Sequence, residues 1–168
     1  ERRARIARPV KIAIIRQRYN PYGGAERFVE RALAALAGEG AEVTLISSVH
    51  LPPPYGAKII PIETVRGLLD AVMAASADAD LLIMAAAVAD FRPQTTADQK
   101  IKKTAANVDS LSLPLTHNED ILEAVKVARQ KSGFPRVVIG FAAESENLLA
   151  NARAKLERKG VDLLVAND

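Results

Sequence analysis

The chain has 168 residues, about the length of one domain, and 49% of them are apolar, which is enough for a single hydrophobic core. Cysteine is absent, so disulfides, thiolate metal sites and a cysteine nucleophile are excluded. The absence of cysteine also fits a cytoplasmic protein. The net charge of +3 comes without a dense basic stripe, and no apolar run reaches about 18 residues, so we expect no nucleic-acid and no membrane partner.

The first part of the chain alternates between apolar runs and a helical pattern. Residues 1–9 are basic and are expected to form a tail. "VKIAII", residues 10–15, is rich in β-branched residues and predicts a buried strand. After "NPYGG", residues 25–40 predict a helix, and residues 42–48 predict a second strand. The apolar face of that helix is formed by Phe28, Val29, Ala32, Leu33 and Leu36.

The alternation continues to the end of the chain. Residues 57–62 predict a short strand or extended segment, and residues 64–76 a helix with Thr64 as its N-cap. Residues 92–109 are polar and irregular. Further strands are predicted at 80–90, 110–115, 136–144 and 161–168, and further helices at 119–131 and 146–160. The 110–115 strand alternates in polarity and is expected to pair as an antiparallel or edge strand.

This order of elements predicts the fold class. Strands that alternate with helices predict an α/β fold, with a Rossmann-like, doubly wound and mainly parallel sheet between two layers of helices. We expect a single domain over residues 1–168. Ligands of such folds bind beyond the carboxyl ends of the strands, so the residues that follow each strand are the first candidates for a site.

Two strand ends carry residues that suit an anionic ligand. The strand at 80–90 ends at Asp90, and Lys100, Lys102 and Lys103 follow. They suit a phosphate and sugar site, in which lysines act as point charges, or a solvated loop that keeps a sheet edge soluble. The Gly23–Gly24 turn precedes a helix whose first N–H groups would favour an anion, although the motif is not G-x-G-x-x-G and a tight turn explains it equally well.

The other polar candidates are weaker. His50 and His117 are the only histidines and have no ligand-like spacing, so no metal site built from the protein is predicted. Lys155 and Lys159 lie four residues apart on one helical face, which is typical of a solvated surface. Phe141, taken alone, is interpreted as a core residue, and no catalytic triad can be argued.

Seven stretches in the later part of the chain form a series. They are "AEVTLIS", "LPPPYG", "MAAAVADFRP", "QKIKK", "NEDILEAV", "IGFAAESENLLANARAKLERKG" and "DLLVAND". In order and spacing they resemble the phosphopantothenoylcysteine synthetase domain of the bifunctional coenzyme A enzyme, from about residue 42 to residue 168.

The resemblance implies an activity and a set of ligand contacts. That family uses CTP and Mg²⁺ to activate the carboxylate of 4′-phosphopantothenate as an acyl-cytidylate, from which the amine of cysteine displaces CMP. Lys100, on the family's flexible loop, would also have the catalytic role of meeting the developing phosphate charge. By position, the CTP contacts fall on Asp90, Lys100, Asn118, Glu119, Asp120, Ile121, Phe141, Lys155 and Lys159.

Residues 10–41 do not follow that family. They carry neither its Gly-Gly-Thr turn nor its Asn-x-Ser-Ser-Gly-Lys loop, whose Asn supports the acyl-cytidylate. "KIAIIRQRYNPYGGAERFVERALAAL" instead resembles the first strand, loop and helix of GT-B glycosyltransferases. We therefore predict a chimera, and suspect an engineered one, joined near "GAEVTLIS"; a natural, diverged homologue is the alternative.

The sequence and its resemblances are compatible with several functions. The first is a domain that binds CTP weakly and does not ligate, because the Asn loop is missing. The alternatives are an active phosphopantothenoylcysteine synthetase and a structural scaffold without a ligand, and glycosyl transfer is a distant further one. The synthetase family is dimeric and residues 92–115 resemble its dimer region, so the resemblance also implies a homodimer.

Overall fold

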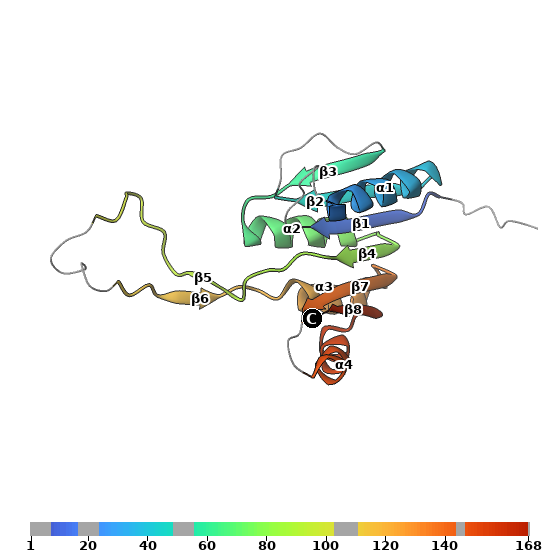
Figure 1. Ribbon diagram of the computed structural model, residues 1–168. Coiled ribbons are helices and arrows are strands. Elements are labelled where there is room, and N and C mark those ends of the chain that lie inside the picture. Colours follow the sequence, from blue (N-terminus) through green and yellow to red (C-terminus); the bar gives the residue numbers. More distant parts are fainter. Residues whose placement is uncertain (1–7, 17–23, 49–55, 103–110, 144–146, 168) are drawn as a thin grey trace, which may run out of the picture.

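The computed structural model describes residues 8–16, 24–48, 56–102, 111–143 and 147–167, without the side chains of residues 24–30, 143 and 167. Six parallel strands form one sheet in the order β3-β2-β1-β4-β7-β8 (Figure 1). Counted within this sheet, that is the 3-2-1-4-5-6 order of Rossmann folds, so the predicted doubly wound sheet is confirmed.

The elements have the following bounds. The sheet strands are β1 (Lys11–Arg16), β2 (Glu42–Ser47), β3 (Ala57–Pro61), β4 (Leu81–Met84), β7 (Val137–Ala143) and β8 (Leu163–Asn167). A separate pair is formed by β5 (Phe91–Pro93) and β6 (Leu115–His117). The helices are α1 (Gly24–Gly38), α2 (Val65–Ser76), α3 (Ile121–Ser132) and α4 (Leu148–Lys159).

Strand β1 lies at the centre, and its residues alternate between two hydrophobic clusters. Ala13 and Ile15 pack with residues of α2 and α3, and Leu156 of α4 packs against the same cluster. Ile12 and Ile14 pack with Leu33 of α1 on the other face. Because helices cover both faces of β1, its residues 12–15 are all buried, which explains the continuous apolar run in the sequence. The structure therefore has three layers, as predicted.

The start of α2 and the end of α4 have the capping residues that the sequence predicts. The Thr64 hydroxyl accepts a hydrogen bond from the Gly67 N–H at 3.0 Å, which confirms the predicted N-cap of α2. Gly160 ends α4 in the left-handed conformation (φ 62°), and its N–H donates to the carbonyls of Leu156 and Glu157. Glycine favours this conformation because it has no Cβ.

Two strand predictions need correction. The strand predicted at 80–90 ends at Met84, because the Ala85 N–H donates to the Ile15 carbonyl and the chain then leaves the sheet. The antiparallel pair exists, but its strands are Leu115–His117 and Phe91–Pro93. The first lies later than the predicted 110–115, because Pro114 has no N–H to donate to a ladder. The second begins at Phe91 and continues into the stretch from residue 92 that the sequence predicted to be irregular.

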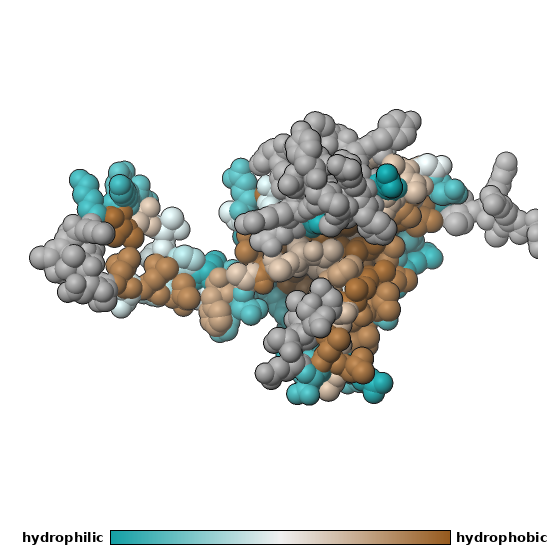
Figure 2. Space-filling view, viewed as in Figure 1, coloured by the Kyte–Doolittle hydropathy of each residue, from teal (hydrophilic) through white to brown (hydrophobic). Residues whose placement is uncertain are grey.

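Residues 91–102 and 111–117 form an arm that projects from the body of the molecule (Figure 1). Apolar side chains lie exposed along it and appear brown in Figure 2. They are Phe91, Ile101, Leu111, Leu113 and Leu115, with exposed fractions between 49% and 61%. Such a row of exposed apolar side chains is unusual for a surface that faces only water.

The predicted N-terminal tail is attached to the body at its last residues. The Arg8 guanidinium forms a bidentate ion pair with the Asp80 carboxylate, with N···O distances of 2.9 and 3.0 Å. The Lys11 N–H donates to the same carboxylate. Residues 1–7 lie outside the described part of the chain, as do Gly23, His50 and Lys103 and the side chains of Phe28 and Val29.

Within the described ranges, the search for a helix long and apolar enough to cross a membrane found none.

Candidate functional site

A cavity of about 770 Å³ lies beyond the carboxyl ends of β4 and β7, where α3 begins and α4 ends. This is the edge of the sheet at which ligands bind in Rossmann-like folds. One wall is the segment that leaves β4, and the opposite side comes from α4. The lining residues include Ala86 to Phe91, His117 to Glu123, Phe141, Ala142, Lys155, Arg158 and Lys159.

The first wall of the cavity is built from small side chains. Residues 86–89 read Ala-Ala-Val-Ala and lie outside any strand. Small side chains let a ligand approach the backbone closely. The same four residues also line a smaller crevice of about 140 Å³, which includes Ile15, Ile46 and Thr64. Segment 86–89 therefore lines both the large cavity and a crevice at the ends of β1 and β2 and the start of α2.

Asn118 connects this wall to the base of the arm. Its carboxamide N–H donates to the Ala89 carbonyl at 2.7 Å, and its carboxamide oxygen accepts from the Arg92 guanidinium at 2.9 Å. Its backbone N–H donates to the Asp90 carbonyl at 2.8 Å. Arg92 also donates to the His117 carbonyl, and the rings of Phe91 and His117 lie 4.2 Å apart. In this structure Asn118 positions the wall of the cavity.

The start of α3 brings the acidic side of the cavity into place. Asp120 is the N-cap of α3, and its carboxylate accepts a hydrogen bond from the Glu123 N–H at 3.1 Å. The other oxygen of the Asp120 carboxylate forms an ion pair with the Lys159 ammonium. Glu119 forms an ion pair with Arg66 of α2 at 3.4 Å. Two of the acidic residues that line the cavity thus already have cationic partners.

Lys159 is a largely buried cation of the cavity, with 14% of its side chain exposed. Burial lowers the pKa of Lys159 from its ordinary value of 10.5, and the nearby charge of Asp90 opposes this change. A buried ammonium that has lost most of its water gains more from an anionic ligand than an exposed one does.

Helix α4 is held against the body from its C-terminal end. The Lys126 ammonium donates to the Arg158 carbonyl at 2.8 Å, and the Arg129 guanidinium donates to the Gly160 carbonyl at 3.4 Å. Arg129 also forms an ion pair with Asp162 at 3.0 Å. These contacts satisfy carbonyls that a helix end leaves without a partner, and they fix the positions of Lys155, Arg158 and Lys159.

The structure brings most of the sequence-predicted residues together. Eight of the nine line this one cavity, namely Asp90, Asn118, Glu119, Asp120, Ile121, Phe141, Lys155 and Lys159. Lys100 lies on the arm and is exposed, outside the cavity lining. Phe141 is 47% exposed, so its interpretation as a core residue is wrong, because no described helix covers that face of β7.

Arg158 and His117 also line the cavity, and the sequence reasoning did not select them. Arg158 lies three residues after Lys155 on the same helix, and that spacing was the available signal. His117 had no signal of its own, because its contact with Phe91 depends on the pairing of β5 with β6. In the part of the chain that the structure describes, no group of three or more metal-ligating side chains is found.

The comparisons with known proteins agree with this geometry. The family described as "DNA/pantothenate metabolism flavoprotein C-terminal domain" matches residues 30–168. The coenzyme A biosynthesis bifunctional protein CoaBC of Vibrio cholerae is 42% identical over 139 residues, which cover 82% of this chain and 34% of that protein. The CoaBC protein of Mycolicibacterium smegmatis is 46% identical over 140 residues, which cover 79% and 33%. The chain therefore spans about a third of the length of these relatives.

Solved structures give the same result. The crystal structure of the C-terminal domain of CoaBC matches with a TM-score of 0.70 and 27% identity, covering 96% of this chain and 78% of that one. The DNA/pantothenate metabolism flavoprotein from Streptococcus pneumoniae matches with a TM-score of 0.70 at 21% identity, covering 95% and 82%, and at that identity it shows the fold alone.

The strand order and the cavity at the carboxyl edge define a Rossmann-like α/β domain with a cavity beyond β4 and β7. The chain belongs to the family of the DNA/pantothenate metabolism flavoprotein C-terminal domain. This confirms the resemblance of residues 42–168 and extends it to residue 30, inside α1. The likeness of residues 10–38 to GT-B glycosyltransferases, and with it the chimera, stays a prediction.

Proposed function

We propose that the cavity binds CTP, and that the chain is the nucleotide-binding part of a CTP-dependent ligase that joins phosphopantothenate to cysteine. The observation that carries the proposal is the gathering of eight expected contact residues around one cavity at the carboxyl edge. The relatives are named for coenzyme A biosynthesis, which agrees with this activity.

The chemistry of the cavity supports a nucleotide. Lys155, Arg158 and Lys159 provide positive charge along one side, and Phe141 and Ile121 provide apolar surface beside it. The positive charges suit a triphosphate, and the apolar surface suits a base and ribose. Attraction between phosphates and partly exposed cations is screened by salt, so the affinity for CTP should fall as ionic strength rises.

We expect that this chain does not catalyse the ligation. The segment between β1 and α1 does not carry the Asn-x-Ser-Ser-Gly-Lys loop that the resemblance associates with the acyl-cytidylate. Orientation of the reacting groups can account for about 7–11 kcal/mol of a barrier, so the loss of a positioning loop should leave little activity. We therefore expect weak CTP binding, with a dissociation constant on the order of 1 mM, and no amide formation.

The test is calorimetric titration with CTP and with ATP in the presence of Mg²⁺, followed by an assay for CTP-dependent amide product. The proposal expects CTP to bind more tightly than ATP and no product to form. A variant that carries the family's Asn-x-Ser-Ser-Gly-Lys loop between β1 and α1 should then form product. Equal binding of CTP and ATP would contradict the nucleotide proposal, and product from the unaltered chain would favour the active synthetase instead.

We also propose that the arm pairs with a second copy of the chain. The exposed apolar row from Phe91 to Leu115 supports this, because pairing would remove it from water. Analytical ultracentrifugation should give a dimer, and Leu111→Lys with Leu113→Lys should give a monomer with an unchanged melting temperature. A monomeric parent chain would contradict the pairing.

A further inference from the structure

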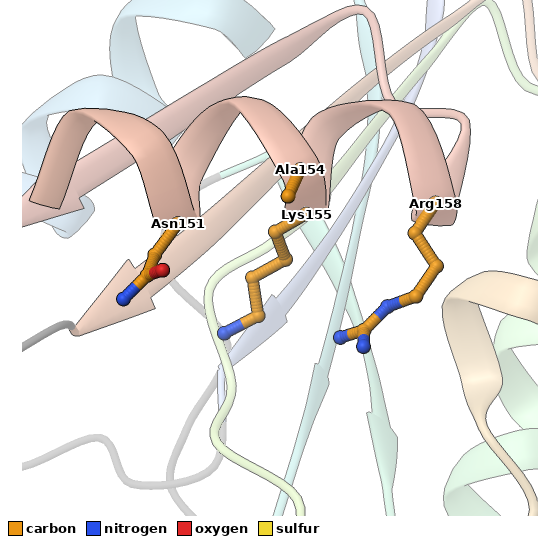
Figure 3. Close-up of a pocket in the computed structure, with 4 residues that line it drawn as sticks. All are labelled: Asn151, Ala154, Lys155 and Arg158. Carbon is orange, nitrogen blue, oxygen red and sulfur yellow. The ribbon is translucent and has the colours of Figure 1, made fainter. Parts of the chain in front are cut away.

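Helix α4 carries a second hollow beside the cavity, formed by Asn151, Ala154, Lys155 and Arg158, with a volume of about 270 Å³ (Figure 3). We call it the α4 hollow. Lys155 and Arg158 line both the cavity and the α4 hollow, so the two adjoin along this helix. We propose that the α4 hollow binds a phosphate group and that Arg158 is its principal ligand.

The spacing of the residues supports the proposal. Positions 151, 155 and 158 follow the helical repeat, and in Figure 3 the side chains of Asn151, Lys155 and Arg158 leave α4 on the same side. Ala154 lies between them and has only a methyl group, which leaves room for the hollow. From residue 151 to residue 158 the helix rises by about 10 Å, and the hollow extends along it to Asn151 and Ala154, which do not line the cavity.

The charges in and around the hollow support an anion. Among the residues that the structure describes, its lining contains two cationic side chains and no carboxylate. Lys159, one residue further along, is already paired with Asp120. By contrast, the Arg158 guanidinium forms no ion pair with any residue that the structure describes, and it is exposed. A guanidinium presents a planar fork of N–H donors that matches the oxygens of a phosphate.

Two sources could supply this phosphate. One is the terminal phosphate of the nucleotide in the cavity, and this source depends on the proposed CTP site. The other is the phosphate of a separate phosphorylated co-substrate bound next to the nucleotide. In both cases the recognised group is a phosphate dianion, so the residues and the chemistry are the same, and only the connection to the nucleotide differs.

The experiment compares Arg158→Gln with Arg153→Gln in the full chain. Arg153 lies on the same helix and lines neither the cavity nor the hollow. Arg153→Gln therefore changes the net charge by the same amount without altering either lining. Each protein is titrated with CTP, with CMP, and with inorganic phosphate in the presence of saturating CTP, at one fixed ionic strength. The ¹⁵N signal of the Arg158 side chain is followed by NMR in the parent chain.

If the nucleotide supplies the phosphate, Arg158→Gln weakens CTP binding about tenfold and leaves CMP binding within twofold. If a co-substrate supplies it, both nucleotides are unaffected and the affinity for inorganic phosphate falls about tenfold. Arg153→Gln should match the parent chain throughout. The proposal is overturned if Arg158→Gln and Arg153→Gln behave alike with all three ligands.

The experiment can contradict the proposed CTP site and the proposed phosphate site in the α4 hollow independently. A parent chain that binds neither CTP nor CMP contradicts the CTP proposal. Inorganic phosphate titrated alone still tests the hollow in that case, because Asn151 and Ala154 lie outside the cavity. A shift of the Arg158 side-chain signal on addition of phosphate supports the hollow, and an unmoved signal contradicts it.

Discussion

The two halves of the sheet differ in how they are covered. Around β1 and β2, helix α1 packs on one face and α2 on the other, and the intervening strand residues are buried. Around β7 and β8, α3 and α4 pack on one face only. On the other face Val137, Phe141, Leu163 and Val165 are 41–52% exposed, and brown surface is visible there in Figure 2.

Because the two halves are covered differently, we expect stability and ligand binding to depend on different halves of the sheet. The β1 half holds the continuous core, so changes there should act mainly on the free energy of unfolding. The β7 half holds the cavity, whose polar residues make contacts at strand ends and helix ends. Changes there should act mainly on affinity.

Leu33→Ala should cause the largest loss of stability. Leu33 of α1 has an exposed fraction of 0% in the second cluster, and truncation of such a side chain costs about 2–5 kcal/mol. Val137→Ala in the β7 half is the comparison, with 42% of Val137 exposed, and it should cost less than about 1 kcal/mol. Chemical denaturation measures both. Similar losses in the free energy of unfolding for the two variants would contradict the different contributions of the two halves to stability.

Asn118→Ala should destabilise the cavity wall and lower the affinity for CTP. The variant removes the hydrogen bond to the Ala89 carbonyl and one of the two acceptors of the Arg92 guanidinium, and the net loss per hydrogen bond is about 0.5–1.5 kcal/mol. Gln130→Ala, an exposed position on α3, is the control. Denaturation and nucleotide titration should both respond. If only affinity changes, Asn118 contacts the ligand and does not position the wall.

The affinity for CTP should fall as pH rises, and Lys159 should set part of this dependence. The pKa of Lys159 is lowered by burial, and an anionic ligand favours its charged form. Binding therefore weakens as pH rises through that lowered pKa, which happens at a lower pH than for a lysine whose pKa is 10.5. For folding the sign is opposite, since the cost of burying the charge decreases as pH rises through the lowered pKa and is gone above the ordinary value of 10.5. Lys159→Gln should remove this part of the pH profile, and an unchanged profile would contradict the role of Lys159.

Asp80→Asn should have the smallest effect, confined to acid conditions. The N–H of Lys11 and the guanidinium of Arg8 lower the pKa of Asp80 below its ordinary value of 3.8. Its stabilising contribution is complete above that value and is lost as pH falls through the lower pKa of the folded state. The difference in stability between the parent chain and Asp80→Asn should therefore shrink below about pH 4. A constant difference down to pH 2 would contradict the assignment.

The sequence predicted the fold well because its signals are local. The apolar run of β1, the cap at Thr64 and the glycine at position 160 each determine their element from neighbouring residues. The end of β4 was not predictable in this way. Residues 85–90 are apolar like a strand, but they leave the sheet beyond the last bond to β1.

The site was predicted largely through the family resemblance. Lys155 and Lys159 share a helical face, which the spacing alone indicates, but their proximity to Asp90 and Phe141 depends on strand order. The role of Asn118 depends on a contact with Ala89, 29 residues away. Arg92 reaches Asn118 only because β5 pairs with β6, and the sequence did not indicate β5 as a strand.

The central claim is that the cations of α4 bind the phosphates of CTP, and one titration tests it most directly. Lys155→Gln with Lys159→Gln is compared with Lys58→Gln with Lys131→Gln, which has the same change in charge at exposed positions outside the cavity. The account predicts millimolar CTP binding in the parent chain and in the control pair, and none in the α4 pair. CTP binding that persists undiminished in the Lys155 and Lys159 variant would contradict it.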